Sequence, residues 1–442
     1  MRDLEHPEND LGTTERRVLD HLDLDRLLAD IEALVALESL GGAETPAQWK
    51  MAERLADLGC DVDTWEIDLD TLARHPSYSA EVERRHALGV VGRWGCGAEG
   101  GRTLVLNGHV DVVPPGDPGR WTTPPWAAAR VRGDDGRDEL RGRGTADMKG
   151  GLCCALAAVR ALRDAGVEIA GQVEVQSVVG EEDGGCGTLA TVLRGLARGS
   201  QKSLADGAIV MEPTRLEVVP AQAGALGFRI TIPGQAAHGA LRREGTSAIE
   251  AFRPVHDALL ELEQRRNAEV AHPLMAELEL PYGLSIGTLR AGDWASTVPE
   301  ELVCEGRYGV AVGESLDAAR QELETAVAEA AACNAWLRKH SPQVAWWGGC
   351  FAPAETSPDA AIVSTVCAAG CDVLGAVPKL SGVPYGSDLR FLTGEGATPS
   401  VLFGPGDVRR AHRPDEGIAI AELEAAARVL ALVILRFCGV AG

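Results

Sequence analysis

The chain has 442 residues, of which 45% are apolar, and its 65 acidic and 42 basic side chains give a formal net charge of −23. This length exceeds what one hydrophobic core usually serves, so we expect two domains, and the apolar content is sufficient for two cores. The negative charge argues against nucleic acid and anionic membranes as partners, since both are polyanions. It suits a cationic substrate.

The start of the chain shows no targeting signal. Met1 to Asn9 are polar and charged, with no apolar run that could serve as a signal peptide, and no later stretch approaches the length of a membrane span. We therefore expect a cytoplasmic protein. The chain has eleven cysteines, several of them inside apolar helical runs, and these are expected to be buried thiols rather than a disulfide framework.

The first part of the chain alternates helical and strand patterns, as an α/β domain does. Residues 68–86 are polar and interrupt this alternation, so we expect them to lie on the surface, with the mouth of a pocket as the alternative place. The predicted helices are Leu22–Leu37, Thr45–Leu58 and Gly150–Ala165, and the predicted strands are Val62–Ile67, Leu104–Leu106, Val173–Val179 and Ala208–Met211.

Residues of the kind that bind metals follow three of these strands. His109 follows Leu104–Leu106, the pair Glu181–Glu182 follows Val173–Val179, and Glu212 follows Ala208–Met211. Ligands of open α/β sheets gather at the carboxyl ends of strands, so these side chains are expected to meet there.

The pattern changes near residue 221. A β-α-β-β-α order follows, which is typical of a ferredoxin-like module. We therefore assign residues 1–220 and 341–442 to an α/β catalytic domain with a central sheet flanked by helices, and residues 221–340 to an inserted module. The module's predicted elements are Gly227–Ile232, Ser247–Arg265, Leu284–Leu289, Glu301–Val310 and Ser315–Lys339; Asp359–Leu374, Ser400–Phe403 and Ile418–Phe437 follow it.

Two histidines and three carboxylates form a candidate two-metal site. Imidazole nitrogen suits zinc, and one carboxylate can bridge two cations about 3.5–4 Å apart. Cobalt or manganese would be possible in place of zinc. The five residues are His109, Asp147, Glu182, Glu212 and His412.

Glu181 is then left over, and a carboxylate beside a ligand is well placed to deprotonate a metal-bound water. Asp111 can accept the other imidazole N–H of His109 and fix its tautomer. Each residue also has a simpler interpretation. His109 alone would be an ordinary histidine, Asp147 could cap a helix, and Glu181–Glu182 could be a solvated pair.

The strings GHVDVVP, GRGTADMKGG and EEDGGCGT, together with His412, resemble the M20 metallopeptidase family from Leu22 onward. The branch most similar is that of acetylornithine deacetylase and succinyl-diaminopimelate desuccinylase. The resemblance implies a zinc-exopeptidase-like catalytic domain with a mixed central sheet and an inserted lid and dimerisation domain. It also implies one or two zinc ions, a homodimer, and removal of an acyl group from an amino nitrogen.

The resemblance also implies a role for each site residue. It implies His109 and Glu212 on one metal, Glu182 and His412 on the other, and Asp147 bridging both. Asp111 would orient His109, and Glu181 would be the general base, in agreement with the assignment made from the residues.

The resemblance adds three candidates for substrate contacts and one for catalysis. His238 matches a lid-domain histidine that stabilises the tetrahedral oxyanion, although a histidine in a turn is the simpler interpretation. Arg307 resembles a lid arginine that binds a substrate carboxylate. Ser387 and Arg390 lie in a segment similar to the substrate loop of desuccinylases. Residues 220–225 lack the arginine that desuccinylases tend to carry, which argues against a dicarboxylate acyl group.

We therefore expect a zinc-dependent amidohydrolase that removes an N-acyl group, acetyl foremost, from a small amino-acid-like molecule. Deformylation of an aminopyrimidine and dipeptidase or carboxypeptidase activity are alternatives. A non-catalytic paralogue that binds a metabolite would be expected to have lost a ligand or the base, and this chain keeps them. A purely structural zinc site would usually be a closed cluster with cysteine.

Overall fold

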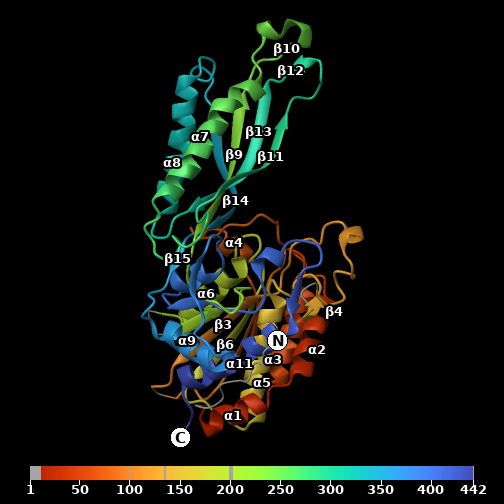
Figure 1. The fold of residues 1–442 in the computed structure, drawn as a ribbon, viewed down its shortest axis with the longest axis vertical. Coiled ribbons are helices and arrows are strands. Elements are labelled where there is room, and N and C mark those ends of the chain that lie inside the picture. The colour runs from red at the N-terminus through yellow and green to blue at the C-terminus, as the bar shows by residue number, and fades with distance from the viewer. Residues whose placement is uncertain (1–10, 99, 134–135, 199–202, 442) are drawn as a thin grey trace. The chain divides into compact units, whose positions relative to one another are not determined.

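The structure, a computed structural model, describes residues 11–98, 100–133, 136–198 and 203–441. The segment Met1–Asn9, for which we expected no signal peptide, lies outside these residues. The chain divides into two compact units (Figure 1). The first comprises the chain up to Pro220 with Glu355–Ser381 and Asp388–Gly442, and the second comprises Ala221–Ala354 with Gly382–Ser387.

The first unit is built on a mixed nine-stranded sheet. Its central strands β6, β3, β7 and β17 run parallel to one another, whereas β2 pairs antiparallel with β6. The order is β1 (Asp61–Glu66), β2 (Leu88–Trp94), β6 (Gln172–Val178), β3 (Thr103–His109), β7 (Gly207–Val210), β17 (Ser400–Leu402), β8 (Val218–Gln222) and β15 (Ala354–Glu355), with β16 (Leu380–Val383) also paired to β8.

Helices cover both faces of this sheet. Every residue of β7, and all but the first of β3 and β6, is buried, which a strand achieves only when both faces are covered. The mixed sheet flanked by helices agrees with the predicted fold class. The helices of this unit are α1 (Thr13–Asp20), α2 (Leu24–Val35), α3 (Thr45–Asp57), α4 (Leu69–Leu72), α5 (Lys149–Asp164), α6 (Cys186–Arg198), α9 (Ala361–Leu374), α10 (Leu389–Thr393) and α11 (Ile420–Cys438).

A small antiparallel sheet joins distant parts of the first unit. It consists of β18 (Gly417–Ala419), β5 (Asp138–Arg141) and β4 (Ala129–Arg132) in that order. Because Gly417 pairs with Arg141, the segment after His412 is held beside the segment before Asp147. This pairing brings the last predicted ligand into the region of the others.

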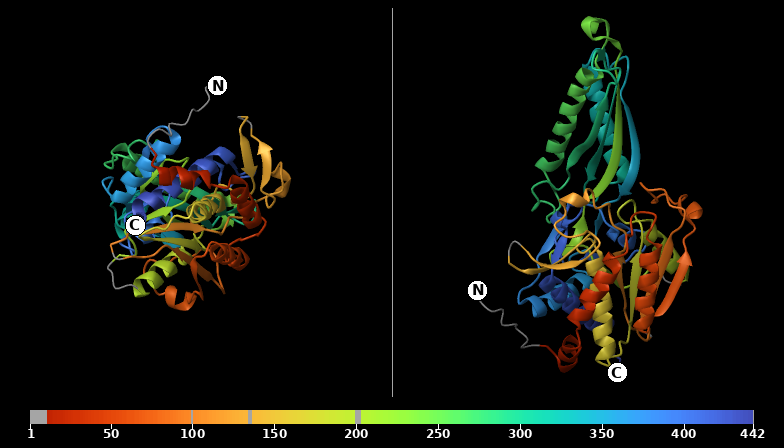
Figure 2. Two further views of the ribbon diagram at one scale, coloured as in Figure 1. Left: turned by 90° about the horizontal axis from the view of Figure 1, so that it is seen from below. Right: turned by 90° about the vertical axis from the view of Figure 1, so that its right-hand side faces the viewer.

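The second unit has the predicted ferredoxin-like order. Its antiparallel sheet runs β11 (Leu284–Ala291), β13 (Glu301–Val310), β9 (Gly224–Pro233) and β14 (Gln343–Phe351). The helices α7 (Ala248–Ala268) and α8 (Leu316–Cys333) run alongside these strands and share one apolar core with them (Figures 1 and 2). A short pair, β10 (Ala237–His238) and β12 (Thr297–Val298), completes the unit.

Two boundaries differ by more than three residues from those expected. The second unit extends to Ala354 instead of residue 340, because β14 pairs with β9 as the fourth strand of its sheet. Helix α8 ends at Cys333 instead of Lys339. Asn334 takes an extended backbone conformation there, and its side-chain oxygen accepts hydrogen bonds from the N–H groups of Trp336 and Leu337, so a separate turn begins.

All eleven cysteines are free thiols. Among the described residues, none of the helices combines the length and apolar character that crossing a bilayer requires.

Candidate metal centre

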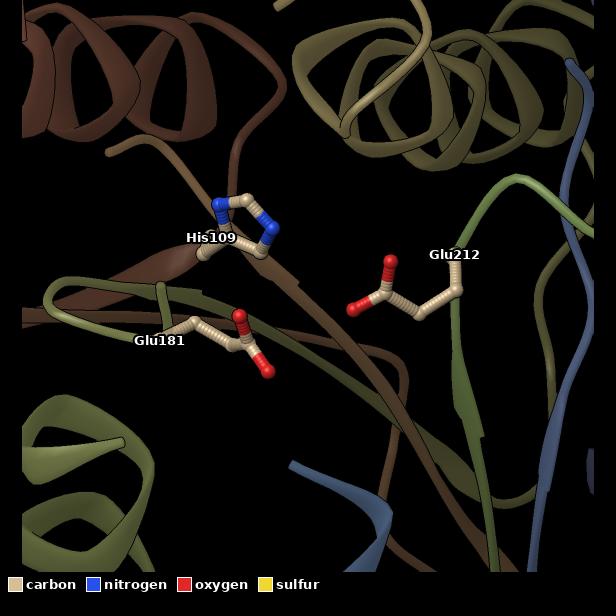
Figure 3. A group of neighbouring side chains, drawn as sticks. All are labelled: His109, Glu181 and Glu212. Carbon is tan, nitrogen blue, oxygen red and sulfur yellow. The ribbon is translucent and has the colours of Figure 1, made fainter. Parts of the chain in front are cut away.

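The sheet topology brings three of the predicted ligand segments to one edge. His109 is the last residue of β3, Glu181 and Glu182 follow β6, and Glu212 follows β7. Because β6, β3 and β7 are adjacent and parallel, their carboxyl ends lie together. Figure 3 shows the side chains of His109, Glu181 and Glu212 directed toward one another, and ligand atoms of these three lie within 4.8 Å of each other.

Asp147 lies between the two histidines. Its Oδ1 is 3.2 Å from Nε2 of His109, and its Oδ2 is 3.5 Å from Nε2 of His412. Nε2 of His412 is also 3.0 Å from Oε2 of Glu182. A carboxylate that offers one oxygen toward each of two imidazoles is arranged to bridge two cations. The atoms of His109, Asp147 and Glu182 form a second group within 4.8 Å.

These carboxylates are crowded and shielded from water. Burial and the nearby carboxylate of Glu212 raise the pKa of Glu181 well above its usual value, and burial and Asp147 do the same to the pKa of Glu212. Burial and the Asp147 carboxylate raise the pKa of Glu182 to about 7. A divalent cation would offset this repulsion. The donor set therefore fits a two-metal centre.

The pKa values of the two histidines are also raised, but by the nearby carboxylates and not by burial. Burial would lower the pKa of His109, but the carboxylates of Asp111 and Asp147 outweigh burial and raise it. Hydrogen bonds to Asp147 and Glu182 raise the pKa of His412 to about 10. The His412 side chain is 53% exposed, so the centre reaches the surface on this side. The backbone of His412 has a φ of +58°, a region that non-glycine residues seldom adopt and that is found at functional sites.

Asp111 supports the centre in two ways. Its main-chain carbonyl lies 2.9 Å from Nδ1 of His109, and a carbonyl can only accept a hydrogen bond. Nδ1 therefore carries the proton, and Nε2 is left as a ligand atom. The carboxylate, which we expected to make this bond, has its Oδ1 3.7 Å from Nδ1. Its Oδ2 accepts a hydrogen bond of 3.1 Å from the main-chain N–H of Glu182.

Glu416 was not singled out from the sequence, although it lies four residues after His412. Its fully buried carboxylate accepts hydrogen bonds from the main-chain N–H groups of Ala146 at 3.0 Å and Asp147 at 3.1 Å, and it is paired with Arg143. Glu416 thus fixes the main chain that presents the central carboxylate of the site. The only sequence signal was its acidic character near a predicted ligand.

The remaining predicted residues have contacts elsewhere. His238 is an exposed residue of β10 in the second unit, where its Nδ1 accepts a hydrogen bond from the N–H of Ala240. Arg307, on β13, donates to the carbonyl of Pro384 at 2.9 Å, and burial lowers its pKa. The roles expected of both residues stay predictions.

Ser387 and Arg390 are buried and make hydrogen bonds within the protein. The Ser387 hydroxyl donates to the side-chain oxygen of Gln222 at 2.5 Å. Arg390 donates to the carbonyl of Gly184 at 2.9 Å, two residues after Glu182. These bonds give both side chains a part in holding loops, in addition to any contact with substrate.

Comparison with known proteins places these observations in a family. The chain is 28% identical over 447 residues to N-formyl-4-amino-5-aminomethyl-2-methylpyrimidine deformylase of Halalkalibacterium halodurans, covering 95% of this chain and 97% of that protein. It is 28% identical over 400 residues to acetylornithine deacetylase of Aliivibrio fischeri, covering 88% of this chain and 90% of that protein.

Solved structures share the fold. Human carnosine dipeptidase 1 matches with a TM-score of 0.73 at 16% identity, over 97% of this chain and 99% of that chain. A tripeptidase from Staphylococcus aureus matches with a TM-score of 0.70 at 19% identity, over 94% and 99%. The model of peptidase family M20/M25/M40 matches residues 105–436, which include all the predicted metal ligands. The chain is therefore a member of peptidase family M20/M25/M40, a family of metal-dependent hydrolases.

Proposed function

We propose that this protein hydrolyses the amide bond of a small N-acylated amine and releases a one- or two-carbon acid. The observation that carries the proposal is the position of Asp147 between His109 and His412, with Glu182 and Glu212 beside it and Glu181 in the same cluster. This is a donor set for two cations with one carboxylate to spare.

In this proposal His109 and Glu212 would hold one zinc ion, Glu182 and His412 would hold the other, and Asp147 would be shared by both. Zinc, or cobalt or manganese in its place, would polarise the carbonyl group and promote ionisation of water. The carbonyl of Asp111 fixes the ring of His109 so that Nε2 is the nitrogen available to the metal, and Glu416 holds the main chain of Asp147.

Glu181 acts as the general base. It takes a proton from the attacking water and returns that proton to the amide nitrogen as the carbon–nitrogen bond breaks. Its buried position, which raises its pKa, makes it a carboxylate able to hold a proton between the two steps.

Two further residues proposed to act on the substrate belong to the second unit. His238 would donate a hydrogen bond to the oxygen that becomes negatively charged in the transition state. Arg307 would bind the rest of the substrate. For Ser387 and Arg390, their existing hydrogen bonds favour a role in positioning the loops that contact substrate.

Acetyl remains the acyl group proposed first, in agreement with the acetylornithine deacetylase relatives. Formyl is the second candidate, because the deformylases of Halalkalibacterium halodurans and Bacillus subtilis match the chain at 28% and 27% identity. Both acyl groups are small. We also propose a cytoplasmic homodimer that associates through the second unit.

The test is release of free amine from N-acetyl, N-formyl and N-succinyl amines and from dipeptides, after metal removal by a chelator and after addition of zinc or cobalt. We expect cleavage of the acetyl or formyl compounds, loss of activity with the chelator, and recovery with metal. If only dipeptides are cleaved, the protein is a peptidase and the proposed deacylase activity is wrong. Activity that is unaffected by complete metal removal would refute the two-metal assignment.

A further inference from the structure

Arg84 belongs to the segment 68–86, which we expected to lie on the surface, yet its side chain is only 3% exposed. Its Nη1 lies 2.7 Å and 2.5 Å from the two carboxylate oxygens of Asp183, the residue directly after Glu182. Its Nη2 and Nε lie 2.8 Å and 3.1 Å from Oε1 of Glu44, which precedes α3. One guanidinium therefore joins the loop after β6 to α3.

The main chain of the same segment is bound to this loop. The N–H of Glu81 donates to the carbonyl of Asp183 at 2.9 Å, and the N–H of Val82 donates to its carboxylate at 3.2 Å. Gly184 has a φ of +142°, and a Cβ there would lie 2.1 Å from the carbonyl oxygen of Ser79. The contact is close enough to require a glycine at this position.

Arg84 also packs against the start of the loop. A Cβ on Gly180, whose φ is +69°, would lie 2.9 Å from Cζ of Arg84. The guanidinium thus contacts residues on both sides of Glu181 and Glu182. The carboxylate of Asp111 accepts a hydrogen bond from the N–H of Glu182, and Arg390 donates one to the carbonyl of Gly184. Between them these contacts leave the loop little freedom to move.

We propose that Arg84 is a positioning residue, which acts through Asp183 to fix the direction of the Glu181 and Glu182 side chains. This inference rests on the proposed function for the roles of those two glutamates. The segment 68–86 thus supplies the arginine that holds residues 179–185, the loop between β6 and α6 that we call the catalytic loop. Displacement of reacting groups by about 1 Å can reduce a rate on the order of 100-fold.

Lysine is not equivalent to arginine at this position. The guanidinium of Arg84 binds both oxygens of Asp183 through Nη1 while Nη2 and Nε reach Glu44, whereas an ammonium group offers a single charged centre. Arg84→Lys keeps the positive charge that two buried carboxylates require, so the variant retains the ion pairing while losing the fixed geometry. Asp183→Asn removes the partner's charge with little change of shape.

The control is Arg160→Lys. Arg160 lies on α5 and donates to the buried carboxylate of Asp30 on α2 at 2.7 Å, so it is also a largely buried arginine paired with aspartate. It contacts no residue of the catalytic loop in the described interactions. Any effect of replacing a buried arginine in general will appear in this variant as well.

The experiment measures three quantities for the full-length wild type and each variant: kcat and KM on the best substrate, affinity for Co²⁺ by calorimetry, and Tm. For Arg84→Lys and Asp183→Asn we expect kcat to fall about 10- to 100-fold, KM to change less than about threefold, and Co²⁺ affinity to fall about tenfold. Arg160→Lys should leave kcat and Co²⁺ affinity unchanged, whatever its effect on Tm.

A folded Arg84→Lys with wild-type kcat and Co²⁺ affinity would overturn the inference. Should that variant not fold, Asp183→Asn decides by the same criteria. The two hypotheses fail separately. If the wild type cleaves none of the amides, the proposed function fails, and loss of Co²⁺ affinity in Arg84→Lys but not in Arg160→Lys still supports the positioning role.

Discussion

Glu181 and Glu182 are neighbours in sequence but have different surroundings. Glu182 faces His412, whereas Glu181 lies with His109 and Glu212 and does not contact His412 in the described interactions. Glu181→Gln removes a base and keeps the shape of the side chain. We expect kcat to fall at least about 100-fold, with metal content close to that of the wild type. The measurement is turnover together with bound metal determined by elemental analysis.

Glu182→Gln is the matched comparison, since it makes the same change one residue away. This variant should lose metal as well as activity, because a carboxylate ligand is replaced by an amide. If Glu181→Gln loses the metal and Glu182→Gln keeps it, the two roles have been exchanged.

Protons compete with metal in this centre. The pKa of His412 is raised to about 10 by Asp147 and Glu182, and the pKa of Glu182 is raised to about 7, chiefly by burial. At pH 7 and without metal, His412 is therefore protonated, and Glu182 is protonated in part of the molecules. Metal requires the unprotonated forms. Affinity should rise as pH increases, by about tenfold per pH unit for each proton displaced.

Calorimetric titration of the metal-free protein with zinc, at pH 7 in buffers of different ionisation enthalpy, measures this release. The observed heat should depend on the buffer in the sense of proton release, and His412→Gln should release fewer protons. A heat that is the same in all buffers would contradict the assignment of His412 as a ligand.

At the scale of single elements, the conformation of the catalytic loop depends on its glycines. Gly184 has a positive φ and lies against the main chain of Ser79, whereas Gly59, with a φ of +79°, has nothing within 4 Å of the position of a Cβ. Gly59→Ala should lower the free energy of unfolding by about 1 kcal/mol through backbone strain alone. In Gly184→Ala the new methyl group would also overlap the carbonyl oxygen of Ser79. This variant should therefore lose more of the free energy of unfolding, and its kcat should fall as well.

Urea denaturation of the two alanine variants checks this difference. Equal losses of stability would show that the loop moves away from Ser79 at little cost, and the brace described for Arg84 would then be weaker than its geometry indicates.

Elements with strong periodicity were predictable from the sequence. Strand β13 has the predicted bounds Glu301–Val310, and the three strands that lead to His109, Glu181 and Glu212 were identified. Helix α6 was not predicted, because glycines dilute the helical pattern of its sequence. Residues that act through distant partners were also missed. Arg84 pairs with a residue 99 positions away, and Glu416 bonds to a main chain 269 positions away. No local pattern reports such contacts.

At the scale of the whole molecule, the predicted ligands and the predicted oxyanion donor lie on different units. His109, Asp147, Glu182, Glu212 and His412 belong to the first unit, and His238 belongs to the second. Strand β11 is an edge strand of the second unit's sheet, with Leu289 on it 50% exposed and Trp294 shortly after it 74% exposed. An exposed edge of this kind is a template for pairing with another chain. It supports the proposal that the second unit forms the dimer.

A mixing experiment tests whether His238 serves its own chain or its partner. Glu181→Gln and His238→Ala chains are each expected to be inactive alone. If His238 acts across the dimer, a mixed dimer contains one site with both groups intact and one with neither. Random reassociation of equal amounts makes about half of the dimers mixed, so about a quarter of wild-type activity should return. We expect this recovery on the proposal that the second unit, on which His238 is exposed, forms the dimer. Mixed dimers, verified by differently tagged chains, that remain inactive would place His238 in its own chain's site or outside catalysis.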